Sequence, residues 1–201
     1  MSTPLRTART AEPEGAHLDV SWILPNLAMG GRFAAAAVAH LVDGLGIRNI
    51  VDLRCEDKDD ESLLRRHAAE LLHLPTLDGS AVASDMLHRG VEWINRQLDR
   101  GEKVLVHCEQ GIGRSALLVC CMLVSRGRTP RLAIEQVKDA RPCAAPSPEQ
   151  LRALLEWTAE WCRAQRAPRP PDTLADLTAI AYRHLTRRST TAADPPRWFR
   201  F

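Results

Sequence analysis

The chain has 201 residues, of which 45% are hydrophobic and 26% are charged, and its formal net charge at pH 7 is +2. These are ordinary values for a globular protein, and they exclude a fibrous or wholly disordered chain. The charge is uneven, because residues 163–201 hold eight arginines and three aspartates, whereas residues 1–162 carry a net charge of −3. A mildly acidic body argues against nucleic acid as a partner.

The N-terminal residues hold no apolar run that resembles a signal peptide, and no stretch of about 18 apolar residues occurs, so no integral membrane segment is expected. The cysteines follow neither a Cys-x-x-Cys pattern nor a regular spacing, which is a poor match to a zinc site or a disulfide framework. They are Cys55, Cys108, Cys120, Cys121, Cys143 and Cys162. We predict reduced thiols in a cytoplasmic protein, with neither metal nor cofactor.

Short strands and helices alternate in the first half of the chain, after a predicted flexible leader at 1–15. Apolar runs and turn residues predict strands at 19–24 and 27–29, a helix at 33–45, a strand at 48–54, a helix at 59–72 and a strand at 72–75. A polar loop at 76–84 follows. Asp85 is predicted to cap the next helix, which Gly101 ends.

The second half continues the alternation with a buried strand at 103–107 and a helix at 115–126 that is apolar almost all round. Thr129 and Pro130 predict the start of a helix to about residue 139, and Ser147 to Gln150 have the spacing of a capping box before a helix at 151–163. A proline-rich break precedes a possible helix at 172–188 and a loose tail. The alternation predicts an α/β fold whose central, mostly parallel sheet of about five strands has helices on both faces.

The segment from Val104 to Ser115 carries most of the chemical signal, because it passes from a strand through a glycine-bearing loop into a helix. Gly111 and Gly113 are predicted to let successive backbone amides turn toward one point. The amino end of the following helix adds its unpaired amides and its positive dipole there. The loop therefore predicts an anion site the size of a phosphate, made by Glu109, Gln110, Gly111, Ile112, Gly113 and Arg114.

Cys108 is predicted to lie at the floor of this site, where converging donors should lower the pKa of its thiol and make it a nucleophile at neutral pH. The guanidinium of Arg114 can hold two phosphoryl oxygens. Ser115 is predicted to donate a hydrogen bond to the sulfur, and His107 to orient the loop backbone rather than act as a base. A lone cysteine on an apolar strand is usually a core residue, but the combination of these residues favours the functional interpretation.

The run His-Cys-Glu-Gln-Gly-Ile-Gly-Arg-Ser resembles the signature loop of the protein tyrosine phosphatase superfamily, in its dual-specificity branch. The resemblance extends from about Asp19 to Cys162. It implies a phosphocysteine intermediate on Cys108, hydrolysis by water without a metal, and the superfamily's central sheet flanked by helices. We accordingly predict a catalytic domain at 16–165, followed by a basic C-terminal helix and tail at 166–201.

A carboxylic acid should protonate the leaving oxygen and then activate water. Asp78, in a loop after a predicted strand and beside Gly79, suits this role better than Asp85, for which helix capping is the expected role. The segment around Asp78 also resembles the acid loop of the cyclin-dependent kinase-associated and Cdc14-like phosphatases. Loop aspartates are usually only turn formers, so the assignment depends on the Cys108 loop.

Cys55 directly follows the predicted strand at 48–54, in a segment that resembles the equivalent strand of tensin-like phosphatases. The resemblance implies a possible redox partner that traps oxidised Cys108 as a disulfide. The alternative is an incidental thiol at the end of a strand.

The predicted substrate is a phosphoprotein carrying phosphotyrosine, phosphoserine or phosphothreonine. Tensin-like phosphoinositide phosphatases carry lysines in the signature loop, whereas this loop has Glu109, Gln110 and Ile112, and a carboxylate repels a polyanionic headgroup. Two other functions stay open: a sulfurtransferase of the rhodanese type and a pseudophosphatase that binds phosphorylated partners without turnover. The sequence predicts no particular oligomeric state.

Overall fold

The structure, a computed structural model, describes residues 18–168 and 170–188. The predicted leader at 1–15 and tail at 189–201 lie outside these residues. A single five-stranded sheet has the order β1-β2-β5-β3-β4, in which β1 is antiparallel to β2 and the other neighbours are parallel. The strands are β1 (Val20–Leu24), β2 (Leu27–Gly30), β3 (Ile47–Arg54), β4 (Glu70–Thr76) and β5 (Lys103–His107).

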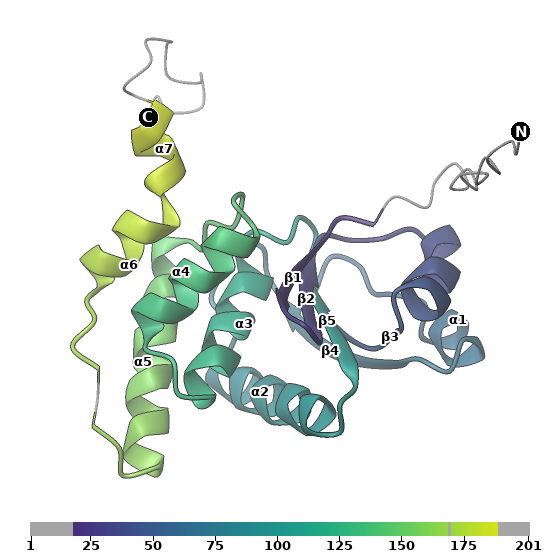
Figure 1. Cartoon of the computed structure of the whole chain (residues 1–201), viewed down its shortest axis with the longest axis horizontal. Helices are drawn as coiled ribbons and strands as arrows, with labels where there is room; N and C mark the ends of the chain where they lie inside the picture. The colour runs from purple at the N-terminus through teal and green to yellow at the C-terminus, as the bar shows by residue number, and fades with distance from the viewer. Residues whose placement is uncertain (1–17, 169, 189–201) are drawn as a thin grey trace, which may run out of the picture.

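Helices cover both faces of this sheet (Figure 1). One face carries the helices of the second half of the chain, which are α2 (Ser84–Asp99), α3 (Arg114–Ser125), α4 (Pro130–Ala140), α5 (Pro148–Ala164) and α6 (Leu174–Ala181). The other face carries the 3₁₀ turn η1 (Ala35–Ala37), the π-helical turn η2 (His40–Gly44) and α1 (Glu61–Arg66). The predicted α/β class, with a mostly parallel sheet and helices on both sides, is confirmed.

Strand β5 lies in the middle of the sheet, between β2 and β3. Val104, Leu105 and Val106 are all fully buried, as expected for a parallel strand covered on both faces. Because β2, β3 and β5 run in parallel, their carboxyl ends meet at one edge, where α/β sheets usually bind their ligands. His107, the last residue of β5, places the following Cys108 at that edge.

Two predicted helices differ from the structure in the first half of the chain. The helix predicted at 59–72 ends at Arg66, because Ala68 takes a left-handed conformation with φ 55° and the chain then enters β4. Pairing with β3 draws Glu70–Thr76 into the sheet and overrides the local helical pattern. The segment at 33–45 is helical only from Ala35, in 3₁₀, α and π turns.

The predicted capping residues had mixed outcomes. Thr129 caps α4, and Ser147 with Gln150 forms a complete capping box at α5, both as predicted. Asp85 does not cap α2: Ala83 occupies the cap position and makes no side-chain bond, while Asp85 lies exposed in the first turn. The capping role predicted for Asp85 was therefore wrong.

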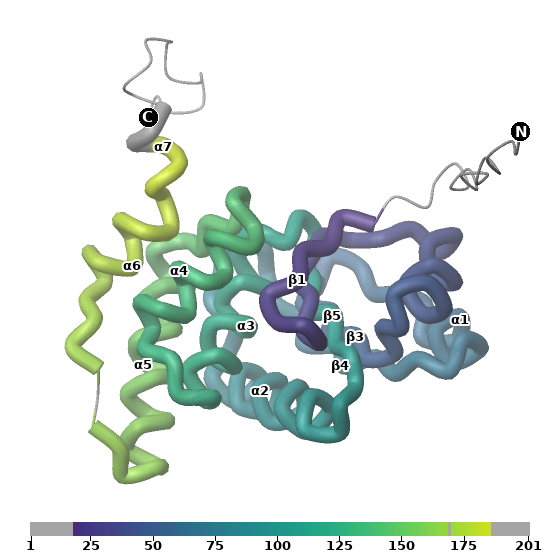
Figure 2. The backbone as a smooth tube through the Cα atoms, viewed as in Figure 1, coloured from purple at the N-terminus to yellow at the C-terminus, as the bar shows by residue number. Residues whose placement is uncertain are grey.

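The C-terminal region forms two short helices where one was predicted. Helix α6 is followed by a break at Tyr182 and then by α7 (Arg183–Arg188). In Figure 2 the yellow-green tube of α6 lies beside α4 and α5, and the structure packs α6 against both helices. Within the described ranges, we find no helix that has both the length and the apolar character needed to cross a membrane.

Candidate active site

The loop between β5 and α3, hereafter the signature loop (residues 108–113), is shaped by its glycines. Gly111 has φ 64°, and a Cβ there would lie 2.4 Å from the carbonyl carbon and oxygen of Gly30. Only glycine satisfies both conditions. Gly113 has a negative φ of −113°, so its role differs from the predicted one: a Cβ would lie 2.5 Å from Oε1 of Gln150. Both positions therefore need glycine, Gly111 for its positive φ and its contact with Gly30, and Gly113 for its contact with Gln150.

The Cys108 thiol is 3% exposed, and its Sγ lies 3.5 Å from the hydroxyl oxygen of Ser115. Burial raises the pKa of this thiol. The hydroxyl and amide of Ser115, the charge of Arg114 and the amide of Gly111 act in the opposite direction, and together they hold the pKa of Cys108 below its ordinary value. The site thus stabilises the thiolate of Cys108 relative to an ordinary cysteine, although the side chain is buried.

Arg114 begins α3 and is buried. Its terminal nitrogens Nη1 and Nη2 donate to the Glu56 carboxylate at 2.8 and 2.7 Å. Nη1 also donates to the Thr76 carbonyl oxygen at 2.8 Å, and Nη2 lies 3.1 Å from Asp78 Oδ1. The hydrogen bonds from Arg114 lower the pKa of Glu56 to about 2. Arg114 Nε is buried and has no hydrogen-bond partner among the described residues, so one N–H remains to be satisfied.

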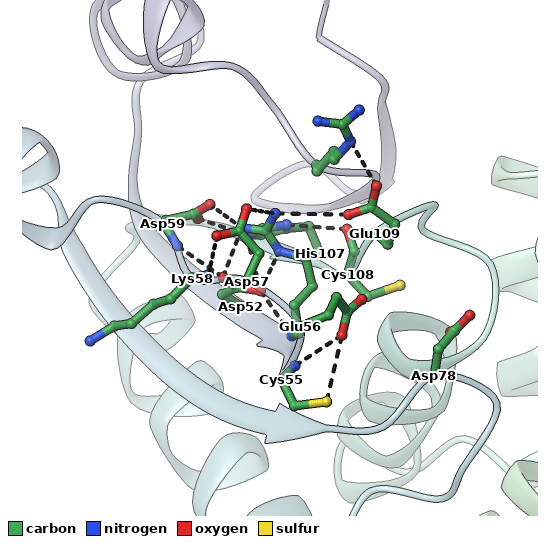
Figure 3. Close-up of polar contacts among 12 residues, drawn as sticks. Asp52, Cys55, Glu56, Asp57, Lys58, Asp59, Asp78, His107, Cys108 and Glu109 are labelled. Atoms are coloured by element: carbon green, nitrogen blue, oxygen red, sulfur yellow. Dashed lines mark hydrogen bonds and ion pairs between the residues drawn. The ribbon is translucent and has the colours of Figure 1, made fainter.

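A hollow of about 150 Å³ opens over the signature loop. Cys108 and Asp78 both line it, together with Gly79, Gln110, Ile112, Gly113, Ala145, Ser147 and Gln150. Asp85 does not line this hollow. The Asp78 side chain is 81% exposed and can therefore move onto a bound group. Glu109 lies apart, since its carboxylate pairs with Arg32 at 2.7 Å and points away from the Cys108 sulfur in Figure 3.

His107 belongs to a buried network behind the loop (Figure 3). Its Nε2 lies 2.8 Å from Asp59 Oδ2, and Arg54 donates to Asp52 at 3.0 Å and to Asp59 at 2.5 Å. Asp52, Asp59 and His107 place ligand atoms within 4.8 Å of one another. The guanidinium of Arg54 donates to both carboxylates, so these residues form an ion-paired, hydrogen-bonded network that contacts His107.

Arg141 supports the signature loop through two of its backbone carbonyls. This buried guanidinium donates to the Gly111 carbonyl oxygen at 2.7 Å and to the Gln110 carbonyl oxygen at 2.9 Å, and it pairs with Asp19. Without Arg141 these two carbonyl oxygens would lose these donors. Neither Arg141 nor Glu56 was identified from the sequence, because each acts through partners far away along the chain.

Comparison with known families agrees with this arrangement. Residues 31–160 match the family described as "Dual specificity phosphatase, catalytic domain". The chain belongs to this family. The match covers most of the chain, and it confirms the superfamily that the residues around Cys108 predicted.

The curated relatives of this dual specificity phosphatase domain have varied names. One from Dictyostelium discoideum, "Probable protein tyrosine phosphatase type IVA B", is 33% identical over 109 residues, covering 52% of this chain and 65% of the relative. One from Arabidopsis thaliana, "Phosphatidylglycerophosphate phosphatase PTPMT1", is 30% identical over 117 residues, covering 56% of this chain and 35% of the relative. The chain thus spans between about a third and two thirds of these two relatives.

Solved structures support the fold. The crystal structure of Tk-PTP in its active form superposes with a TM-score of 0.65 at 27% identity, covering 69% of this chain and 95% of that one. PTPMT1 in complex with PI(5)P superposes with a TM-score of 0.69 at 24% identity, covering 74% of this chain and 99% of that one. The second likeness is evidence for the cysteine phosphatase fold alone.

The dual specificity phosphatase site brings together the side chains predicted to act in catalysis. Cys108 contacts Ser115, Arg114 contacts Asp78, and Asp78 shares the hollow with Cys108. Cys55 is an exposed free thiol, and Cys108 is also free. The Glu56 carboxylate accepts from the Cys55 amide at 3.1 Å and lies 3.7 Å from its sulfur. The redox role of Cys55 stays a prediction.

Proposed function

We propose that this protein is a cysteine-dependent phosphatase that hydrolyses phosphate monoesters through a phosphocysteine intermediate on Cys108. One observation carries the proposal: a buried thiol with a lowered pKa lies on a phosphate-sized hollow, beside a buried guanidinium that keeps one N–H unpaired. A phosphoryl oxygen would supply the missing acceptor. Arg114 would then stabilise charge that develops on that oxygen.

The reaction proceeds in two balanced steps. The Cys108 thiolate forms a sulfur–phosphorus bond as the phosphorus–oxygen bond to the leaving group breaks, and Asp78 gives its proton to the departing oxygen. Water then attacks phosphorus and gives a proton back to Asp78, while the sulfur–phosphorus bond breaks. Ser115, 3.5 Å from the sulfur, stabilises the departing thiolate in this second step. The other signature-loop residues bind phosphate through their amides.

The proposed substrate is a phosphorylated tyrosine, serine or threonine side chain of a protein. The signature loop carries no cationic side chain between Cys108 and Arg114, and Glu109 places a carboxylate beside it. A headgroup with several phosphates would find no cationic side chain in the loop for its further phosphates, whereas a single phosphomonoester needs only the loop amides and Arg114. The name of the Dictyostelium relative agrees with this class. The free thiols support a cytoplasmic location.

A lipid phosphomonoester is the second candidate. The relative from Arabidopsis thaliana is named for phosphatidylglycerophosphate, and one from Rattus norvegicus is named "Phosphatidylglycerophosphatase and protein-tyrosine phosphatase 1". Arg32, 66% exposed beside Glu109, also offers a cation next to the signature loop. Arg32 is already paired with the Glu109 carboxylate, so we rank the lipid phosphomonoester below the phosphoprotein.

The test compares the wild type with Cys108→Ser, Asp78→Asn and Asp85→Asn on phenyl phosphate, a phosphopeptide panel and phosphatidylglycerophosphate vesicles. We expect Cys108→Ser to abolish phosphate release while still binding substrate. Asp78→Asn should slow turnover by about 10²- to 10⁴-fold above mildly acidic pH, because the proton donor is lost. Asp85→Asn, in the exposed first turn of α2, serves as the control.

Two outcomes would contradict the proposal. Phosphate release that survives in Cys108→Ser would exclude the phosphocysteine route, and a larger loss in Asp85→Asn than in Asp78→Asn would move the acid. If phosphatidylglycerophosphate in the vesicles is hydrolysed and no phosphopeptide is, the substrate is a lipid phosphomonoester. Thiocyanate formation from thiosulfate, or tight phosphopeptide binding by a wild type without turnover, would instead favour a sulfurtransferase or a pseudophosphatase.

A further inference from the structure

The loop that carries Asp78, hereafter the acid loop (residues 77–83), has little internal support. It joins β4 to α2. Its internal backbone hydrogen bond runs from the Ser80 amide to the Leu77 carbonyl oxygen at 3.2 Å. Gly79 adopts φ 77° with open space around it, and the Asp78 side chain is largely exposed. The position of the acid must therefore be set by contacts from outside the loop.

Besides the ion pair between Arg114 and Asp78 and the burial of Val82 in the core, those contacts come from the first turn of α5. The Ser147 hydroxyl donates to the Gly79 carbonyl oxygen at 2.9 Å, and Gln150 Nε2 donates to the Ser80 carbonyl oxygen at 2.9 Å. Glu149 Oε1 accepts from the Ala81 amide at 3.1 Å. Three consecutive residues of the acid loop, directly after Asp78, are thus bonded to three residues separated from them by 68 or 70 positions in the chain.

The first turn of α5 is itself held rigidly. Gln150 is 1% exposed, and its Oε1 accepts from the Ser147 amide at 2.9 Å, which closes the capping box. A Cβ on Gly113 would lie 2.5 Å from this same oxygen, so Gln150 also packs against the signature loop. A single turn of helix therefore contacts both the loop that holds the nucleophile and the loop that holds the acid.

We propose that the first turn of α5 is the docking site of the acid loop, and that Ser147, Glu149 and Gln150 are positioning residues for the general-acid step. The proposal rests on the proposed function, because it assigns to these residues the task of setting the reach of Asp78 over Cys108. The hydrogen bonds hold the backbone of residues 79–81, while the Asp78 side chain stays free to turn from Arg114 to the leaving oxygen.

The leaving group gives a readout that a purely structural role would not move. A nitrophenyl phosphate releases a stabilised phenoxide that needs little protonation, whereas phenyl phosphate releases a basic phenoxide that needs a proton from Asp78. In Ser147→Ala/Glu149→Ala, which removes two docking bonds, we expect kcat/KM for phenyl phosphate to fall about tenfold or more, since small misplacements can cost about 10²-fold. The nitrophenyl value should fall by a much smaller factor, because a stabilised leaving group depends little on the position of the acid.

Matched variants separate docking from capping and charge. Ser147→Thr/Glu149→Gln keeps the hydroxyl donor and the carbonyl-type acceptor. Like the double alanine variant, it loses the negative charge of Glu149, so the restored phenyl phosphate rate that we expect would show that the hydrogen bonds matter and the charge does not. Thr173→Ala removes the capping box of α6, away from the acid loop, and should leave both rates unchanged. In an Asp78→Asn background, the double alanine change should add less than about twofold, because the positioned acid is already absent.

Equal losses on both substrates, or a loss that adds fully to that of Asp78→Asn, would overturn the docking proposal. Failure of the rescue variant to restore the phenyl phosphate rate would do the same. The proposed function fails separately, when the wild type releases phosphate from neither substrate or when Cys108→Ser still does.

Discussion

At the scale of single residues, the chemistry depends on a balance between burial and donors at Cys108. Burial alone would keep this thiol protonated, as it does at Cys120 and Cys121 in the middle of α3, where it raises both pKa values. The pKa of Cys108 is lowered instead, because Ser115, Arg114 and the Gly111 amide stabilise its thiolate. Three thiols of similar burial therefore have pKa values shifted in opposite directions, because one of them faces hydrogen-bond donors.

This difference can be measured by alkylation. We expect iodoacetate to modify Cys108 at neutral pH, and to leave Cys120 and Cys121 unmodified in the folded protein. Because the thiolate is the reactive form and its pKa lies below the ordinary value, the rate should persist as the pH falls below that value. Ser115→Ala should raise the pKa of Cys108 and shift the rate profile to higher pH. Mass spectrometry of timed digests gives the rates, and an unshifted profile in Ser115→Ala would contradict the role given to its hydroxyl.

At the scale of elements, the signature loop works because a strand and a helix hold its two ends while glycine permits the turn between them. Of the twelve residues of α3, all but Ser125 are buried, so the helix cannot shift to accommodate a distorted loop. Arg141 then donates to the carbonyl oxygens of Gln110 and Gly111 in the loop. The strand and the helix at its ends, together with Arg141, thus fix the geometry of the signature loop.

Gly111→Ala tests this constraint against a matched glycine. Gly111 and Gly101 both have positive φ, of 64° and 78°, but a Cβ at Gly101 meets nothing within 4 Å. We expect Gly101→Ala to cost about 1–2 kcal/mol of unfolding free energy from backbone strain alone. Gly111→Ala must also displace the Gly30 backbone, so it should lose phosphate affinity and more stability. Urea unfolding and competitive inhibition by phosphate measure the two effects, and equal behaviour of the variants would show that the loop is not constrained by Gly30.

At the scale of the whole molecule, the C-terminal helices belong to the packed body. Leu177 and Ala181 of α6 are fully buried in the main core, and the Tyr182 hydroxyl donates to the Pro146 carbonyl oxygen at 2.9 Å. The family match ends at residue 160, and the sequence predicted a catalytic domain ending at 165. We propose that the folding unit continues through α6, because its removal would expose a strip of core.

Leu177→Ala and Leu185→Ala distinguish the two boundaries. Leu177 is buried between α6 and the core, whereas Leu185 on α7 is 37% exposed. We expect Leu177→Ala to lower the unfolding free energy by about 2–5 kcal/mol in one cooperative transition, and Leu185→Ala to stay within about 0.5 kcal/mol. A separate early transition in Leu177→Ala, with the remainder of the protein unfolding at the original urea concentration, would support the boundary at 165.

Local signals in the sequence determined much of this protein. The alternating pattern, the strand–loop–helix around Cys108 and the caps at Thr129 and Ser147 depend on residues close together in the chain, where periodicity and short side-chain-to-backbone bonds act. The α/β class and the family followed from them. The same local reasoning extended the helix predicted from residue 59 to residue 72, although α1 ends at Arg66, and it predicted a cap at Asp85 that the structure does not have.

Only the tertiary structure decided the support of the site. Arg141 reaches Asp19 across 122 positions, Glu56 reaches Arg114 across 58, and α5 holds the acid loop across about 70. No local pattern indicates such pairs, because each exists only after the sheet and its helices have brought distant segments together. The pairing of residues 70–76 with β3 overrode a helical pattern for the same reason: long-range contacts outweigh the small differences in local propensity.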